Sequence, residues 1–258
     1  MERVELFGLP FIADQDLRRV IEEVLAWPLP QQAKDELPLL STPNVDQVVK
    51  LHRKENAELL AKIRRARYVL PDGQPIIWVS RRIKEKSLPA RLPGSDLFPL
   101  LWRSLAERAR PVFMVLANEA IGQALKKENA DMHWWVPPFY SITDPGAEGQ
   151  VVDTVFKELM ERPVPLVFLG LGFPKQERLA LALVHRLETA GAPMPLFLLL
   201  GASFEFHAGL KKRAPRIWQR LGLEFLHRFL SEPKRMFRRY FVDDLAFFKL
   251  ALKEVRSR

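Results

Sequence analysis

The stretch Val164-Pro165-Leu166-Val167-Phe168-Leu169-Gly170-Leu171-Gly172-Phe173-Pro174-Lys175-Gln176-Glu177 decides the fold class. An apolar run, a glycine-rich turn and an amphipathic stretch with Pro174 as its first helical residue predict a buried strand, a tight turn and a helix. Backbone N–H groups at such a helix start favour a phosphate or diphosphate. The third glycine of a dinucleotide fingerprint is absent, so a plain tight turn stays open on these residues alone.

The same strand-then-helix unit recurs along the chain. Strands are predicted at residues 4–7, 37–41, 68–70, 112–116, 132–136, 164–169 and 196–200, with helices between most of them. This alternation predicts an α/β fold with a Rossmann-like, largely parallel sheet flanked by helices. After Gly201 the pattern changes to short helical pieces and then to a longer helix over about 234–255. We therefore expect a core domain of residues 1–210 and a helical, basic appendage of residues 211–258.

Composition excludes several classes of protein. With 258 residues, 48% of them hydrophobic, the chain can bury a full core, and without cysteine it has neither a disulfide framework nor a thiolate nucleophile. Its longest apolar stretch, residues 193–201, is far shorter than the roughly 20 residues of a spanning helix. The N-terminus lacks a basic region followed by an apolar run, so the sequence predicts no secretory signal.

The charge is segregated at one end of the chain. Residues 211–258 hold 14 Lys and Arg against five Asp and Glu and so carry the whole net charge of +9. Aromatic and aliphatic residues recur at helical spacing among these cations, at Phe237, Phe241, Leu245, Phe248 and Leu252. Such a helix can bind an anionic membrane surface, or it can pack on its own domain or on a second subunit of a homo-oligomer. Nucleic-acid binding is disfavoured, because no KH, RRM or zinc-finger signature is present.

Asp72 follows a predicted strand, at the sheet edge where open α/β folds bind ligands. Gly94-Ser95-Asp96 reads as a helix N-cap by Ser95 or Asp96, and the acidic pair in Asp14-Gln15-Asp16 reads as capping too. The five histidines are scattered without metal-ligand spacing, so we expect no metal site. Gly201-Ala202-Ser203-Phe204-Glu205 lacks the second glycine of a nucleophile elbow, which disfavours serine hydrolase chemistry.

Taken together, these segments resemble the WecG/TagA/CpsF glycosyltransferases, classed as glycosyltransferase family 26. The resemblance runs through nearly the whole chain. Its most specific parts are the Pro-Lys-Gln-Glu segment and the arginine-rich segment near the end. In order, the matching segments are Thr42-Pro43-Asn44, Leu70-Pro71-Asp72-Gly73, Leu88-Pro89-Ala90-Arg91, Gly94-Ser95-Asp96-Leu97, Gly172-Phe173-Pro174-Lys175-Gln176-Glu177, Phe206-His207-Ala208-Gly209, Arg213-Ala214-Pro215, Leu223-Glu224-Phe225-Leu226-His227-Arg228 and Glu232-Pro233-Lys234-Arg235-Met236-Phe237-Arg238-Arg239-Tyr240.

The resemblance implies transfer of a sugar from a UDP-sugar to a polyprenyl-diphosphate-linked saccharide, with inversion and without a metal or other cofactor. It places the enzyme on the inner, cytoplasmic face of the cell membrane, in cell-surface polysaccharide (exopolysaccharide) biosynthesis. It makes Asp72 the catalytic base, assisted by Thr42 and Gln176. The implied substrate-binding residues are Asn44, Arg91, Gly172, Pro174, Lys175, Glu177 and, from an appendage that folds over the site, Arg228, Arg235 and Arg238.

Two departures from the family pattern affect the expected specificity. Ala117-Asn118 stands where the family usually has a glycine pair, and Pro137-Pro138 stands where it often has His-Gly. Either change can alter nucleotide or sugar selectivity, so the donor stays open among N-acetylmannosamine, its uronic acid and hexoses such as glucose. The alternative functions are a catalytically silent, membrane-associated assembly factor of the same fold and a basic nucleic-acid-binding protein.

Overall fold

The computed structural model describes residues 1–28, 35–83, 87–211, 215, 218 and 245–256. Its centre is an eight-stranded sheet in the order β1-β2-β4-β3-β8-β7-β5-β6, in which only the β1–β2 pair is antiparallel. The predicted α/β fold with a largely parallel sheet is therefore confirmed. The strands are β1 Arg3–Leu6, β2 Leu9–Ile12, β3 Leu37–Ser41, β4 Ala66–Val69, β5 Val112–Val115, β6 Met132–Trp135, β7 Leu166–Leu169 and β8 Leu196–Leu199.

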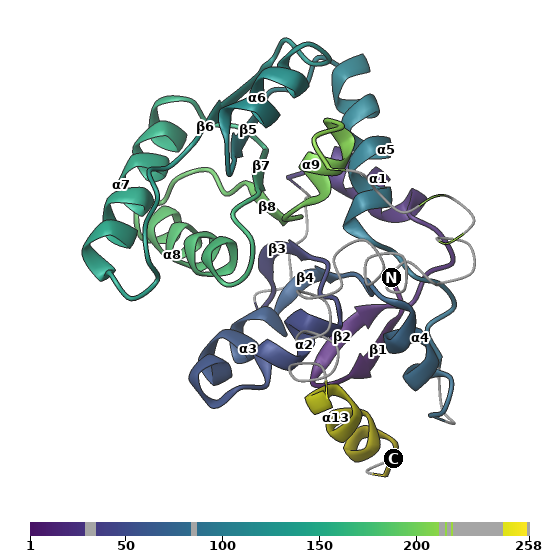
Figure 1. Ribbon diagram of the computed structural model, residues 1–258. Coiled ribbons are helices and arrows are strands. Elements are labelled where there is room, and N and C mark those ends of the chain that lie inside the picture. The colour runs from purple at the N-terminus through teal and green to yellow at the C-terminus, as the bar shows by residue number, and fades with distance from the viewer. Residues whose placement is uncertain (29–34, 84–86, 212–214, 216–217, 219–244, 257–258) are drawn as a thin grey trace.

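Helices cover both faces of the sheet (Figure 1). Side chains alternate between the faces along each strand, so in β7 Val167 and Leu169 belong to one hydrophobic cluster while Leu166 and Phe168 belong to the other. The first cluster is covered by α2 Val45–Leu51, α3 Ala57–Ile63, α7 Pro145–Glu161 and α8 Lys175–Thr189. The second is covered by α1 Arg18–Leu25, α5 Gly94–Glu107, α6 Glu119–Lys126 and α9 Ser203–His207. The remaining elements are η1 Lys54–Asn56, α4 Gln74–Ser80 and α13 Leu245–Arg256.

The helix starts confirm one capping prediction and correct two others. Asn44 caps α2 through a capping box, in which its side chain accepts the N–H of Gln47 and the Gln47 side chain accepts the N–H of Asn44. The cap predicted for α1 at Asp14 or Asp16 is not at the N-cap position, which is Leu17 and makes no side-chain capping bond, although Asp16 accepts the N–H of Arg18. The predicted N-cap at Ser95 or Asp96 is wrong, because α5 begins at Gly94 and both residues lie inside its first turn.

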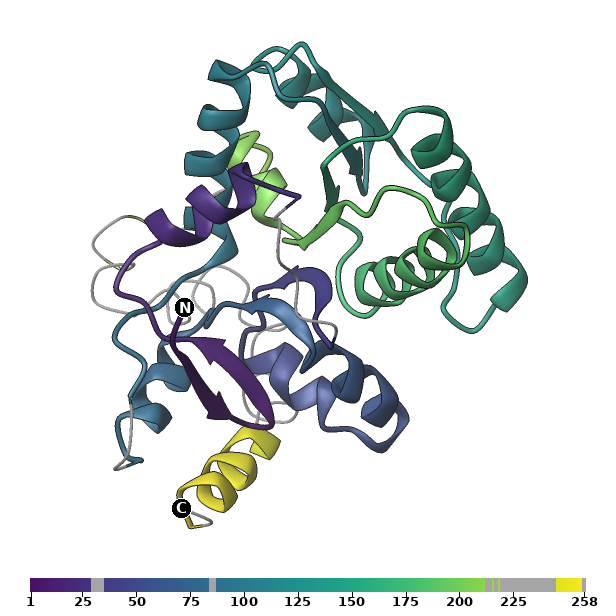
Figure 2. The ribbon, with the colours of Figure 1, turned by 180° about the vertical axis from the view of Figure 1, so that it is seen from behind.

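Helix α13 packs on the core domain far from the predicted site. Its Phe247 is buried, and the Phe247 ring lies 5.3 Å from that of Phe7 in the turn between β1 and β2. Leu250 and Ala251 pack against the same core cluster. Because β2 runs parallel to β4, the β1–β2 turn lies at the amino edge of the sheet, opposite the edge where Asp72 follows β4. Both views of the ribbon show α13 beside the β1–β2 hairpin (Figures 1 and 2).

Candidate functional site at the carboxyl edge of the sheet

The parallel strands direct their following loops to one edge of the sheet. The loops after β3, β4, β7 and β8 begin at Thr42, Leu70, Gly170 and Leu200, and β3 and β8 are neighbours in the sheet. Four separated segments of the sequence are thereby brought to one carboxyl edge. This is the edge at which open α/β sheets bind their ligands.

Asp72 lies against the start of α2. Its N–H donates to the carbonyl oxygen of Pro43 at 3.3 Å, and its side chain is half-buried rather than enclosed in apolar packing. A Cβ built on the next residue, Gly73 (φ +149°), would lie 3.7 Å from Val45 Cγ2. The loop carrying Asp72 is thus fixed beside the segment carrying Thr42 and Asn44. The resemblance implies that Asp72 is the catalytic base and that Thr42 and Asn44 line the pocket. The two segments that carry these residues lie together at one place on the carboxyl edge, which we call the corner.

Thr42 meets two further segments at this corner. A Cβ built on Gly94 would lie 3.0 Å from both Thr42 Oγ1 and Ser203 Oγ, so the starts of α5 and α9 close on the end of β3. The N–H of Leu92 donates to the carbonyl oxygen of Pro71 at 2.8 Å, which places the partly buried Arg91 next to the loop of Asp72. Thr42 itself is only 6% exposed.

The glycine-rich turn after β7 joins the corner through α8. Gly172 has φ +73°, a conformation that favours glycine, and the N–H of Gln176 donates to the Gly172 carbonyl oxygen at 3.1 Å. Because the Gln176 N–H is already hydrogen-bonded inside the turn, it does not bind the predicted phosphate. Only the other N–H groups at the start of the helix are left for that role. The prediction that Pro174 is the first helical residue is wrong by one position, because α8 begins at Lys175 and Pro174 is its N-cap.

Gln176 and Glu177 are buried side by side at the start of α8, 1% and 2% exposed. Gln176 Nε2 donates to Glu177 Oε1 at 3.0 Å. Within the described part of the chain, neither Gln176 Oε1 nor Glu177 Oε2 has a hydrogen-bond partner. Burial raises the pKa of the Glu177 carboxyl to about 7. A Cβ on Gly201, after β8, would lie 3.8 Å from Gln176 Oε1, so the amide faces the loop that follows β8.

Lys175 links α8 to the loop after β6. Its Nζ donates to the carbonyl oxygen of Tyr140 at 2.6 Å and lies 5.0 Å from the ring centroid of Phe139. The Phe139 side chain is 97% exposed, although it is a large apolar group. An exposed ring beside a lysine is a surface on which a flat aromatic ligand can stack.

The structure brings together most of the residues predicted for the site. Arg228, Arg235 and Arg238 lie outside the described residues. Ser203 Oγ donates to the Leu200 carbonyl oxygen at 2.8 Å, an ordinary structural bond. Over the described ranges, no group of three or more His, Asp or Glu side chains is arranged to hold a metal ion.

The model of the Glycosyl transferase WecG/TagA/CpsF family matches residues 4–258, almost the whole chain. The chain belongs to this family. It is therefore a glycosyltransferase, and the resemblance inferred from its sequence motifs is confirmed.

In this glycosyltransferase one of the two departures from the family pattern has a local explanation. Asn118 caps α6, because its Oδ1 accepts the N–H of Ile121 at 3.2 Å. Pro137 and Pro138 precede the exposed Phe139 and stand in the loop that Lys175 contacts. Both departures therefore lie at the carboxyl ends of β5 and β6 rather than in the corner of Asp72. In the described ranges no helix is long and apolar enough to span a bilayer.

Three features of the site could not be predicted from the sequence. Gly94 lies close to Thr42 and to Ser203, and these three residues are distant in sequence. No sequence signature marks Phe139 as an exposed ring. The motif around Gly201 predicts no role in the site, although the positive φ of Gly201 (+52°) and its neighbour Gln176 place it there.

Proposed function

We propose that this glycosyltransferase moves a sugar from a UDP-sugar to a hydroxyl group of a polyprenyl-diphosphate-linked saccharide, with inversion and without a metal. The observation that carries the proposal is the convergence of Asp72, Thr42 and the Arg91 segment at one corner of the carboxyl edge. The chain's membership of a glycosyltransferase family supports sugar transfer as its reaction, and we assign that reaction to these residues. The product belongs to cell-surface polysaccharide biosynthesis.

In the proposed reaction the acceptor hydroxyl oxygen attacks the anomeric carbon of the donor sugar. As the new C–O bond forms, the bond between that carbon and the diphosphate oxygen breaks, and UDP leaves with the electron pair. Asp72 takes the hydroxyl proton, a role that needs an ionised carboxylate with access to the acceptor. Its half-buried position satisfies the second requirement. Arg91, and in our proposal Arg228, Arg235 and Arg238, stabilise the charge that develops on the diphosphate.

The proposed donor lies along the sheet edge, with its sugar near Asp72 and its nucleoside near β5 and β6. Strands β3, β8, β7 and β5 are successive neighbours, so the edge from Thr42 to the end of β5 covers three steps of about 4.8 Å, roughly 14 Å. An extended UDP-sugar fits this span. The diphosphate then passes the start of α8, and the exposed Phe139 ring is available to stack on uracil.

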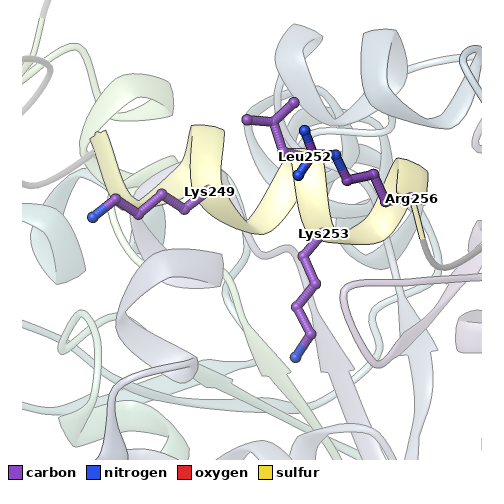
Figure 3. A pocket seen from close by; sticks show the side chains of 4 residues that line it. All are labelled: Lys249, Leu252, Lys253 and Arg256. Atoms are coloured by element: carbon purple, nitrogen blue, oxygen red, sulfur yellow. The ribbon is translucent and has the colours of Figure 1, made fainter.

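We further propose that α13 binds the inner, anionic face of the cell membrane. Phe248, Leu252 and Val255 form one apolar stripe and are 64%, 57% and 39% exposed. Lys249, Lys253 and Arg256 follow the same spacing beside them, and Figure 3 shows these three cations with Leu252. Apolar contact plus about 1 kcal/mol per basic residue near an anionic surface supports peripheral binding. Because α13 lies at the opposite edge from Asp72, it supplies affinity and takes no part in the chemistry.

A screen of UDP release tests the reaction. Purified protein is supplied with several UDP-sugars, with and without a short-chain lipid-diphosphate-linked saccharide, and the glycosylated lipid is identified by mass spectrometry. We expect one UDP-sugar to be consumed with formation of a lipid product one sugar larger. Absence of turnover with every donor, from protein that binds UDP, would instead support a silent assembly factor of the same fold.

A further inference from the structure

Glu177 is a buried carboxyl group that the proposed chemistry does not use. It is 2% exposed, and within the described ranges the one side-chain hydrogen bond shown for its carboxyl is accepted from Gln176 Nε2 at 3.0 Å. Burying a polar group with an incomplete set of partners costs stability, more so when the group ionises. Leu179 and Ala180, which follow Glu177 on α8, are core residues. An apolar side chain at position 177 would therefore cost less stability than the buried carboxyl does.

Glu177 accepts its side-chain hydrogen bond from Gln176, whose amide lies beside Gly201 at the carboxyl edge of the sheet. Gln176 is 1% exposed, its Nε2 is directed at Glu177, and its Oε1 has no hydrogen-bond partner within the described ranges. Gly201 stands beside that Oε1, at the end of β8 next to the corner of Thr42 and Ser203. A side-chain amide can turn by half a rotation and exchange its donor for its acceptor. The bond to Glu177 selects the orientation in which the buried Oε1 faces Gly201.

We propose that Glu177 is a positioning residue, which fixes the Gln176 amide so that its Oε1 accepts a hydrogen bond from a hydroxyl group of the bound donor. The inference rests on the proposed function, because it names Gln176 Oε1 as an acceptor for a UDP-sugar. The direct substrate-binding role that the resemblance implies for Glu177 is thereby replaced by an indirect one, which fits its buried carboxyl. Glu177 acts through Gln176 and does not itself touch the substrate.

The proposal makes Glu177 necessary for turnover but not for folding. In Glu177→Leu the Gln176 amide loses its anchor, and we expect kcat/KM to fall by about tenfold or more while the melting temperature stays equal or rises. Glu177→Gln keeps a carbonyl oxygen for Gln176 Nε2 and restores most of the activity. In the double variant Gln176→Leu/Glu177→Leu the loss equals that of Gln176→Leu alone, because residues that act as one unit are not additive.

The test compares these variants by UDP-release kinetics and by NMR of the ligand-free protein. The matched control is Glu188→Gln, at the exposed far end of the same helix. The side-chain amide signals of Gln176 are identified by their absence in Gln176→Leu. We expect them to shift and to exchange faster with solvent in Glu177→Leu, and to stay near their native positions in the Gln variant and in the control.

Two outcomes overturn the positioning role. One is an unchanged Gln176 signal in Glu177→Leu, and the other is a loss of kcat/KM that adds to that of Gln176→Leu. The NMR measurement needs no substrate. If the wild-type protein releases UDP from no sugar donor, the proposed function fails, and the amide signals still decide whether Glu177 orients Gln176.

Discussion

Gly94 lies so close to Thr42 that a Cβ on the glycine would be 3.0 Å from Thr42 Oγ1. The same atom would lie 3.0 Å from Ser203 Oγ and 3.3 Å from Leu200 Cδ2, so a side chain on the first residue of α5 would make contacts tighter than usual and push its neighbours aside. This contact joins three segments of the chain, which are the end of β3, the end of β8 and the start of α5. Thr42, which precedes the Pro43 that accepts the N–H of Asp72, is one of the residues at this contact.

Gly94→Ala is therefore expected to displace Thr42. We predict a destabilisation of about 1–3 kcal/mol, measured by urea unfolding, together with a loss of turnover larger than the small change in folded fraction explains. The control is Gly149→Ala in α7, where an added Cβ meets no atom within 4 Å, and it should leave the protein equally stable or slightly more so. Unchanged kinetics in Gly94→Ala would show that the corner tolerates movement of Thr42.

Glu177 makes stability depend on pH. Its folded-state pKa, about 7, is raised by burial above the ordinary value of a glutamate, so the folded protein keeps its proton longer than the unfolded chain does. The contribution of Glu177 to the free energy of unfolding is therefore fully present below its ordinary pKa. It is lost as the pH rises toward 7, where the buried carboxyl ionises. In Glu177→Gln this loss is absent.

The difference in unfolding free energy between Glu177→Gln and the wild type should thus grow with pH and level off above about 7. The expected size is roughly 3 kcal/mol, since one pKa unit corresponds to about 1.4 kcal/mol. Urea unfolding at several pH values measures it, with Glu188→Gln as the exposed control. A constant difference across the range would mean that Glu177 ionises normally.

Phe139 tests the orientation of the donor. If its exposed ring stacks on uracil, Phe139→Ala should raise KM for the UDP-sugar by about tenfold or more and leave kcat nearly unchanged, since base stacking on an aromatic side chain contributes about 1–3 kcal/mol. Phe139→Trp should keep the affinity. Equal KM values for all three proteins would place the nucleoside elsewhere on the carboxyl edge.

Helix α13 should confer affinity for anionic vesicles. We predict that Phe248→Ser/Leu252→Ser weakens co-sedimentation with phosphatidylglycerol-containing liposomes at every salt concentration. Lys249→Gln/Lys253→Gln should weaken it mainly at low salt, because exposed charges are screened. Lys157→Gln, an exposed lysine on α7, is the control. Wild-type binding to RNA but not to vesicles would contradict the membrane assignment.

The sequence predicted the elements whose signals are local. The strand at Leu37–Ser41 was found to the residue, because its apolar run ends at Thr42-Pro43 and Asn44 caps the helix that follows. The hairpin of β1 and β2 was missed. Its turn has positive φ at both Phe7 and Gly8, and a buried phenylalanine replaces the Asn or Asp usual at the first of these positions.

Features that arise from contacts between segments distant in sequence could not be predicted from the sequence. The N-cap prediction at Ser95 and Asp96 is wrong because α5 begins at Gly94, which lies close to Thr42 and Ser203, both of which are distant in sequence. Asp72 was identified from its place after a strand and from the family pattern. The burial of Glu177 could not be foreseen, since a charged residue in the first turn of a helix is ordinarily solvated.

The central claim is that Asp72 is the base of the transfer reaction, and Asp72→Asn tests it most directly. The amide keeps the shape of the side chain but cannot take the acceptor proton, so we predict a fall in kcat of about 10²- to 10⁴-fold with the preferred donor and acceptor. Asp153→Asn, an exposed aspartate paired with Arg186, should turn over as the wild type does. A kcat for Asp72→Asn within a few-fold of the wild type would contradict the account.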